Sequence, residues 1–354
     1  MKAGIMGFPS SGRRTLFRLL TQTQDTSSMR AYEPKLGVLK IPDGRLSEVA
    51  RIQHSLKETP ATIEFVLIPG LVKGESRERL DLPAIRNVDI LVQVARGFDE
   101  PSVPHPEGSV DPRRDLELME LELMMADLDL VAKRLARMET DLKKGQKPDP
   151  KEMASLQNAK KALSSETPLR EVLTDDDQKR LRGFALLTAK PRLLVINIGE
   201  QDLRTDWTET LKLRKWMDAP RTGLSHVTAR IEAEITELSP EDAVNFREDL
   251  GLEEGAAERL VHAAFDLTDM ITFYTAEAKE ARAWNIPRGT RAPAAAGTVH
   301  SDMERGFIRA EVVPFEVLIE EESWNACRER GRLRLEGKDY TVADGDVIYF
   351  RFNV

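Results

Sequence analysis

The chain of 354 residues contains one cysteine, so it cannot form an internal disulfide, which is typical of proteins in a reducing compartment. Its apolar runs are all shorter than the roughly 20 residues that a membrane-spanning helix needs. The N-terminus lacks a signal-peptide pattern. The five histidines are scattered, and none stands at metal-ligand spacing from a cysteine or another histidine. These absences favour a cytoplasmic protein without a membrane segment or a zinc site.

An excess of positive charge is also missing. The chain has 52 lysines and arginines against 60 acidic residues, which gives a formal net charge of -8. This balance excludes a polybasic nucleic-acid binder and gives no indication of DNA sequence recognition, although it leaves room for a local basic patch. A hydrophobic content of 41% over this length is enough for roughly two or three domains.

The strongest chemical signature lies between a short apolar run at residues 3–6 and a helical pattern at residues 16–20. A strand, a loop with glycines five apart and a helix are typical of a phosphate-binding loop, in which backbone N–H groups hold an anion. The usual pattern ends in lysine and then serine or threonine, whereas this chain has two arginines there. A strand–helix turn without a ligand remains the alternative. The predicted nucleotide-binding residues are Gly7, Phe8, Pro9, Ser10, Ser11, Gly12, Arg13, Arg14 and Thr15.

Strand and helix patterns alternate through much of the chain. Strands are expected at residues 37–42, 63–68, 89–94 and 191–198, with helices starting near residues 44 and 82. A further strand leads to residue 228. The alternation predicts an α/β fold with a mostly parallel sheet.

The pattern is helical from residue 115 to 185. Leu121, Met124, Leu128, Val131, Leu135, Met138 and Leu142 alternate steps of three and four, which indicates a heptad seam. Residues 145–150 break it, and a weaker seam follows. We expect an antiparallel coiled-coil hairpin inserted into the α/β domain, or else a stabilising arm or an intermolecular coiled coil. The predicted domains are therefore 1–114 with 186–275, the hairpin 115–185, and an α+β module at 276–354.

Several stretches together resemble one family, the YchF-type (Obg-like) P-loop ATPases and GTPases. Residues 7–17 resemble the family's G-x-P-x-x-G-K-S-T-L-F, residues 33–38 its E-P-N-x-G-V, and residues 64–72 its E-F-x-D-x-x-G-L-V. Residues 110–129 are similar to the start of its coiled-coil insertion. Residues 300–312 and 335–340 are similar to its C-terminal TGS domain, a ubiquitin-like β-grasp fold. The resemblance implies a P-loop G domain, an inserted hairpin, a TGS domain and association with ribosomes or RNA.

The chain departs from this family where magnesium binds. The family's phosphate lysine corresponds to Arg13, and its magnesium-linked serine, threonine and aspartate correspond to Arg14, Ala31 and Leu67. Its glycine-rich switch is replaced by residues 75–80. Magnesium neutralises charge during phosphoryl transfer, and none of the three replacements supplies an oxygen ligand. Magnesium-dependent hydrolysis is therefore expected to be lost or weak, and no catalytic or metal-binding residue is assigned.

Base recognition is expected from Asn197 and Glu200, which resemble the family's N-x-x-E motif. In that family the motif accompanies acceptance of adenine. Thr228 and Ala229, which follow the next predicted strand, complete the expected nucleotide-binding set. The expected cofactor is ATP or GTP. The alternative is that these residues only end a strand and begin a helix.

Four arginines alternate at positions 328, 330, 332 and 334. If a strand reached back that far, they would line one face. Arg332 and Arg334 are then candidates for contacts with RNA or ribosomal phosphates, since a guanidinium suits such groups. The alternative is a solvated face paired with Glu329 and neighbouring acids. A ribosomal contact through the hairpin also stays open.

Three functions fit these observations. The first is a ribosome- or RNA-associated regulatory protein that binds nucleotide and hydrolyses it weakly or not at all. The second is an active ATPase or GTPase with a rearranged metal site. The third is a nucleotide-free scaffold that acts through the hairpin and the TGS domain. The sequence sets neither the choice between ATP and GTP nor the oligomeric state.

Overall fold

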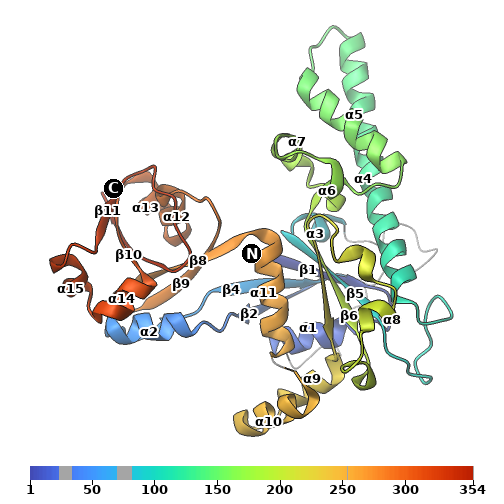
Figure 1. The fold of residues 1–354 in the computed structure, drawn as a ribbon. Helices are drawn as coiled ribbons and strands as arrows, with labels where there is room; N and C mark the ends of the chain where they lie inside the picture. Colours follow the sequence, from blue (N-terminus) through green and yellow to red (C-terminus); the bar gives the residue numbers. More distant parts are fainter. Residues whose placement is uncertain (24–33, 70–81, 253, 354) are drawn as a thin grey trace. The chain divides into compact units, whose positions relative to one another are not determined.

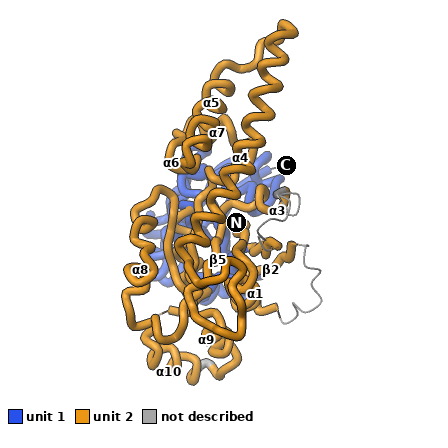
Figure 2. The backbone as a smooth tube through the Cα atoms, turned by 90° about the vertical axis from the view of Figure 1, so that its right-hand side faces the viewer, with its two compact units in different colours: residues 1, 40–63, 268–354 blue, residues 2–39, 64–267 orange. Residues whose placement is uncertain are grey.

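The computed structural model describes residues 1–23, 34–69, 82–252 and 254–353. The chain forms two compact units (Figure 2). The larger consists of Lys2–Leu39 and Glu64–Leu267, and the smaller of Met1, Lys40–Ile63 and Thr268–Val354. No helix within the described ranges is long and apolar enough to cross a membrane.

The larger unit is built on a sheet whose described strands run in the order β2-β4-β1-β5-β6-β7 (Figure 1). The pairs β4–β1, β1–β5, β5–β6 and β6–β7 are parallel. The predicted α/β fold is thereby confirmed. The strands are β1 (Lys2–Gly7), β2 (Lys35–Lys40), β4 (Thr62–Leu67), β5 (Ile90–Arg96), β6 (Arg192–Asn197) and β7 (Thr222–Val227).

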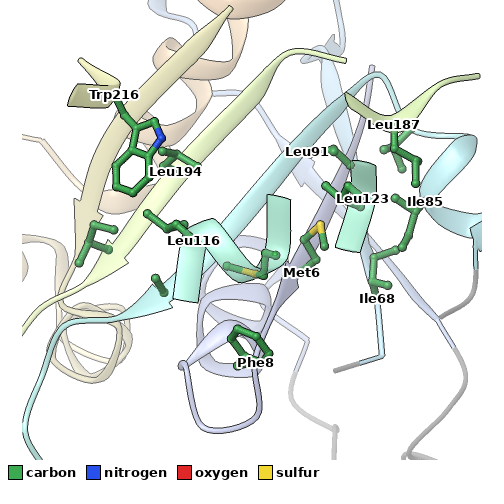
Figure 3. Packing of buried hydrophobic residues seen from close by; sticks show 14 of the residues in the cluster. Met6, Phe8, Ile68, Ile85, Leu91, Leu116, Leu123, Leu187, Leu194 and Trp216 are labelled. Carbon is green, nitrogen blue, oxygen red and sulfur yellow. The ribbon is translucent and has the colours of Figure 1, made fainter. Parts of the chain in front are cut away.

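Helices and short 3-10 turns connect these strands. A hydrophobic cluster joins side chains of the sheet, such as Met6, Leu91 and Leu194, to Leu116 and Leu123 of the first long helix (Figure 3). The elements are α1 (Arg13–Thr21), α3 (Leu82–Arg86), α4 (Pro112–Lys143), α5 (Pro150–Ser164), α6 (Leu169–Val172), α7 (Asp175–Leu181), η2 (Arg182–Phe184), η3 (Leu187–Ala189), η4 (Glu200–Asp202), α8 (Trp207–Thr210), η5 (Arg214–Trp216), α9 (Ala229–Ile235), α10 (Pro240–Leu250) and α11 (Ala256–Thr268).

The inserted helical hairpin consists of α4 and α5. The side chain of Asp111 caps the first turn of α4 by accepting the Arg114 N–H at 3.0 Å. Beyond the sheet, Val131, Leu135 and Met138 of α4 pack with α5 in a separate apolar cluster. The seam is shorter than predicted, because Leu121 and Leu142 are exposed.

The smaller unit has a mixed sheet, whose described strands run in the order β11-β10-β12-β8-β9-β3. Helices pack against it in two apolar clusters. This α+β module agrees with the predicted C-terminal domain class. Its strands are β3 (Glu58–Thr59), β8 (Met270–Ala276), β9 (Ala281–Pro287), β10 (Phe307–Pro314), β11 (Arg334–Glu336) and β12 (Asp346–Phe352), and its helices are α2 (Gly44–Ile52), α12 (Ala292–Val299), α13 (Ser301–Arg305), α14 (Phe315–Glu321) and α15 (Trp324–Glu329).

The division of the chain differs from the predicted boundaries. Residues 40–63 were expected in the G domain, but they belong to the smaller unit, as do residues 268–275. The apolar face of α2 packs with Tyr274 and Val347 of the mixed sheet, and β3 pairs in parallel with β9. Arg45 of α2 adds an ion pair to Asp344 at 2.8 Å. Burial of this face explains why the segment leaves the parallel sheet and returns to it at β4.

Candidate functional site

The loop between β1 and α1 is shaped by its two glycines. Gly12 caps α1 with φ = 91°, a left-handed conformation that favours glycine. A Cβ atom added there would lie 2.1 Å from Nδ2 of Asn197, and one added at Gly7 would lie 2.5 Å from the Val94 carbonyl oxygen. The start of α1 has no side-chain cap, so its first N–H groups are open to an anion.

Ser11 places a buried hydroxyl inside this loop. The residue is 2% exposed, and its Oγ has no hydrogen-bond partner among the described residues. A buried hydroxyl without a partner costs stability, so such groups are nearly always satisfied by protein, water or ligand. A phosphate oxygen would accept a hydrogen bond from this hydroxyl. The orphaned hydroxyl and the glycine cradle therefore fit a nucleotide phosphate.

The two arginines of the loop occupy different surroundings. The guanidinium of Arg13 is buried and donates a hydrogen bond to the backbone carbonyl of Ile68, just after β4. Burial, with a smaller contribution from Arg14, lowers the pKa of Arg13 to about 10, so it stays charged at neutral pH. Arg14 is exposed and forms no ion pair with any residue that the structure describes.

Asn197 connects the loop to the ends of two further strands. Its Nδ2 donates to the Ser11 carbonyl oxygen at 3.2 Å, and its Oδ1 accepts the Ala229 N–H at 3.1 Å. The structure thus brings together Ser11, Asn197 and Ala229, which are distant in sequence. Glu200 lies nearby in the chain, at the start of η4, and is exposed.

Glu232 is a buried residue that the sequence interpretation missed. Its carboxylate accepts the Thr228 N–H at 3.1 Å and the Ala256 N–H at 2.6 Å, and it pairs with Arg259 at 3.2 Å. It therefore fixes the start of α9, where Thr228 and Ala229 lie. The sequence signal that could have identified Glu232 is its position, one helical turn after the end of the strand predicted to lead to residue 228.

The residues at the family's magnesium positions do not fit the ion in the usual way. Leu67 is buried at the end of β4, and Arg14 is a cation. Ala31 and the switch segment at residues 75–80 lie outside the described residues, as do Glu33 and residues 70–74 of the family motifs. In the described part of the chain, no group of three or more His, Cys, Asp or Glu residues is placed to hold a metal ion.

The prediction that four alternating arginines line one strand face is wrong. Arg328 lies in α15, Arg330 is its C-cap, and β11 begins only at Arg334. Ser323 caps α15 and so favours a helix where the charge pattern suggested a strand.

The two arginines proposed for RNA contact already have partners. Arg332 pairs with Glu320 and with Glu321, the latter at 3.2 Å, so acidic partners were correctly expected as the alternative, although these two are not Glu329. Arg334 donates to the Tyr340 hydroxyl at 3.0 Å and lies 3.6 Å from an Asp346 carboxylate oxygen. A phosphate would have to compete with these acidic groups.

Comparisons with known proteins agree along the whole chain. A family model described as YchF-GTPase_C, protein of unknown function (DUF933), matches residues 270–353. "Ribosome-binding ATPase YchF" of Bacillus subtilis is 39% identical over the full length of both chains. "Obg-like ATPase 1" of Pongo abelii is 31% identical over all of this chain and 92% of the relative. The solved YchF GTPase of Schizosaccharomyces pombe has a TM-score of 0.84 at 26% identity, covering 99% of this chain and 97% of the other. This chain belongs to the YchF/Obg-like ATPase family.

Proposed function

We propose that this chain is a cytoplasmic, ribosome-associated regulatory protein that binds ATP or GTP through residues 7–15, Asn197, Glu200, Thr228 and Ala229. The observation that carries the nucleotide site is the orphaned Ser11 hydroxyl in a glycine cradle that Asn197 holds in place. The names of the relatives, ribosome-binding ATPase and GTPase, support the ribosomal association and the nucleotide class.

Arg13 and Arg14 take over the charge neutralisation that a lysine and a magnesium ion share in related sites. Two guanidinium groups provide two positive charges and planar donor forks that suit phosphate oxygens. Such a site stabilises a bound nucleotide, but Arg14 and Leu67 supply no oxygen ligand for an ion that would stabilise charge on the leaving oxygen. Binding and hydrolysis therefore separate, with binding retained and turnover slow.

Calorimetric titration with ATP, GTP and their diphosphates, each with magnesium or with a chelator, tests this function. We expect binding that persists in chelator and weakens in both Arg13→Ala and Arg14→Ala. Turnover should stay far below the order of 1 s⁻¹ that marks slow ordinary enzymes. Turnover near that value that disappears with chelator would instead establish an ATPase or GTPase with a rearranged metal site.

One contact favours the scaffold alternative. The Arg13 guanidinium already donates to the Ile68 carbonyl, so the loop satisfies part of its own charge without a ligand. In a nucleotide-free scaffold Arg13→Ala would reduce stability, and no nucleotide would bind. If the unmodified chain binds neither ATP nor GTP at millimolar concentration, the chain is a nucleotide-free scaffold.

The ribosomal contact is assigned to the C-terminal unit through Arg332 and Arg334, with the α4–α5 hairpin as the other candidate. Co-sedimentation with ribosomes should fall steeply with salt, because phosphate contacts release counterions. Arg332→Ala and Arg334→Ala should weaken it. Lys338→Ala, which removes a charge from an exposed turn of the same unit, is the matched control. Unchanged co-sedimentation of the two arginine variants would move the contact to the hairpin.

A further inference from the structure

The smaller unit contains a groove that none of the motifs above accounts for. It has a volume of about 380 Å³ and is lined by residues of β8, β9 and β12 of the mixed sheet and of the helices α12 and α13. Its walls combine aromatic and aliphatic side chains with charged ones. Trp284, Phe352 and Met303 represent the first kind, and Lys279 and Arg282 the second.

The indole of Trp284 supports the wall of the groove and stacks beside Phe273, with ring centroids 6.5 Å apart. Trp284 Nε1 already donates to Thr275 Oγ1 at 2.9 Å, so the polar edge of the indole is satisfied. The guanidinium of Arg282 lies over the ring, 4.0 Å from its centroid. Phe352 is 41% exposed on the same groove. Aromatic rings and guanidinium planes are the surfaces on which unpaired bases stack.

The charges around the groove favour an anion. Neither Lys279 nor Arg282 forms an ion pair with a residue in the described ranges. Of the two carboxylates in the lining, Glu280 is engaged by the Thr59 hydroxyl and by Lys57 at 3.0 Å. These contacts lower the pKa of Glu280 and keep it ionised. Glu277 is the second carboxylate, so Lys57, Lys279 and Arg282 together exceed the two carboxylates by one positive charge.

We infer that this groove binds an unpaired nucleotide of single-stranded RNA. The base packs on the outer face of the Arg282 guanidinium, which stacks on Trp284, and against Phe352, and the adjoining phosphate is held by the N–H groups of Arg282 and by Lys279. An apolar peptide side chain would fill the aliphatic part of the groove. It would leave the two cations without a partner, and for that reason RNA is the better occupant. The inference rests on the proposed ribosomal association, of which it names one contact.

Fluorescence anisotropy of labelled ten-nucleotide oligo(A) and oligo(U) with the full chain tests the groove. Because stacking contributes roughly 1–3 kcal/mol per base and Trp284 holds the guanidinium plane of Arg282 in place, Trp284→Leu should weaken binding about tenfold, whereas Trp284→Phe should keep most of the affinity. Arg282→Gln should weaken binding severalfold and reduce the salt dependence by about one phosphate contact. Arg288→Gln is the control, since Arg288 follows the opposite end of β9 and does not line the groove.

Each outcome decides the matter. Equal affinities of the unmodified chain and Trp284→Leu, or equal losses in Arg282→Gln and Arg288→Gln, overturn the inference. The inference is also overturned if the oligonucleotides do not bind, but a peptide ending in an aromatic residue does bind and Trp284→Leu abolishes that binding. Co-sedimentation with ribosomes is measured in parallel. If it persists while the oligonucleotides do not bind, the groove fails and the proposed function stands. If the unmodified chain does not sediment with ribosomes, the proposed association fails separately. Should Trp284→Leu not fold, Arg282→Gln and Trp284→Phe still decide.

Discussion

Replacing Gly12 by alanine measures how closely the loop is held against Asn197. The left-handed backbone costs an L-residue about 1 kcal/mol. The new Cβ would also lie 2.1 Å from Nδ2 of Asn197, so that side chain has to move. Its movement breaks the hydrogen bonds to Ser11 and Ala229, each of which contributes about 1 kcal/mol. We expect Gly12→Ala to lower the free energy of unfolding by about 3 kcal/mol.

Asn197→Ala removes the same two hydrogen bonds by a different route. It leaves the Ser11 carbonyl and the Ala229 N–H without a side-chain partner, and should cost about 2–4 kcal/mol. In the double variant the added Cβ no longer meets an amide, and the lost hydrogen bonds are counted once. The double variant should therefore be about 2 kcal/mol more stable than the sum of the single effects predicts.

Urea unfolding followed by tryptophan fluorescence provides the measurement. Replacing Trp284 and Trp324 by phenylalanine in every variant leaves Trp207 and Trp216, which both lie in the larger unit that holds the loop. The signal then reports the unit of interest rather than a mixture of two transitions. Additivity within about 0.5 kcal/mol would refute the reasoning, because it would mean that Gly12 and Asn197 do not interact.

Three further predictions concern other ionisable groups. Burial and the neighbouring Arg259 lower the pKa of His226 to about 4, so the unfolded chain binds this proton at a higher pH than the folded chain does. The free energy of unfolding of the larger unit should therefore fall by up to about 3 kcal/mol from pH 6.5 to pH 4. In urea titrations, His226→Gln should remove this pH dependence. Arg45→Ala should destabilise the smaller unit by about 1–2 kcal/mol, monitored by its own tryptophans, and unaltered stability would show that the pair with Asp344 is solvent-screened. Glu120→Gln breaks ion pairs to two buried arginines and should lower the free energy of unfolding by about 3–5 kcal/mol. The control Glu117→Gln, at an exposed position of the same helix, should change it by less than about 1 kcal/mol. Equal urea midpoints of the two variants would contradict this prediction.

The parts of the fold that follow from local pattern could be predicted from the sequence. Alternating apolar runs and turns identified the parallel sheet, and the heptad spacing identified the hairpin. The loop at residues 7–15 was visible because its glycines lie in one short stretch. These features depend on neighbours in sequence, and so they need no knowledge of distant contacts.

What failed depends on partners far away in the chain. The pattern at residues 44–50 correctly indicates a helix, but nothing in it says that Leu46 and Val49 pack on a sheet formed more than 200 residues later. In the same way, alternation of arginines near residue 330 suited a strand until Ser323 was seen to cap a helix. The Asn197–Ser11 contact was approached only through family resemblance, because hydrogen bonds across 186 residues leave no local signature.

The excursion at residues 40–63 determines how this protein can be divided experimentally. A fragment beginning at residue 268, or at residue 270 where the family model begins, would lack α2 and β3. It would expose to water the apolar surface that Leu46, Val49 and Ile52 cover in the full chain. A fragment ending at residue 267 would carry α2 without its sheet. Both products are candidates for aggregation, so loss of function in either would report misfolding rather than the role of the deleted part. A tethered design, in which residues 40–63 are joined by a flexible linker to residue 268, would keep this packing intact.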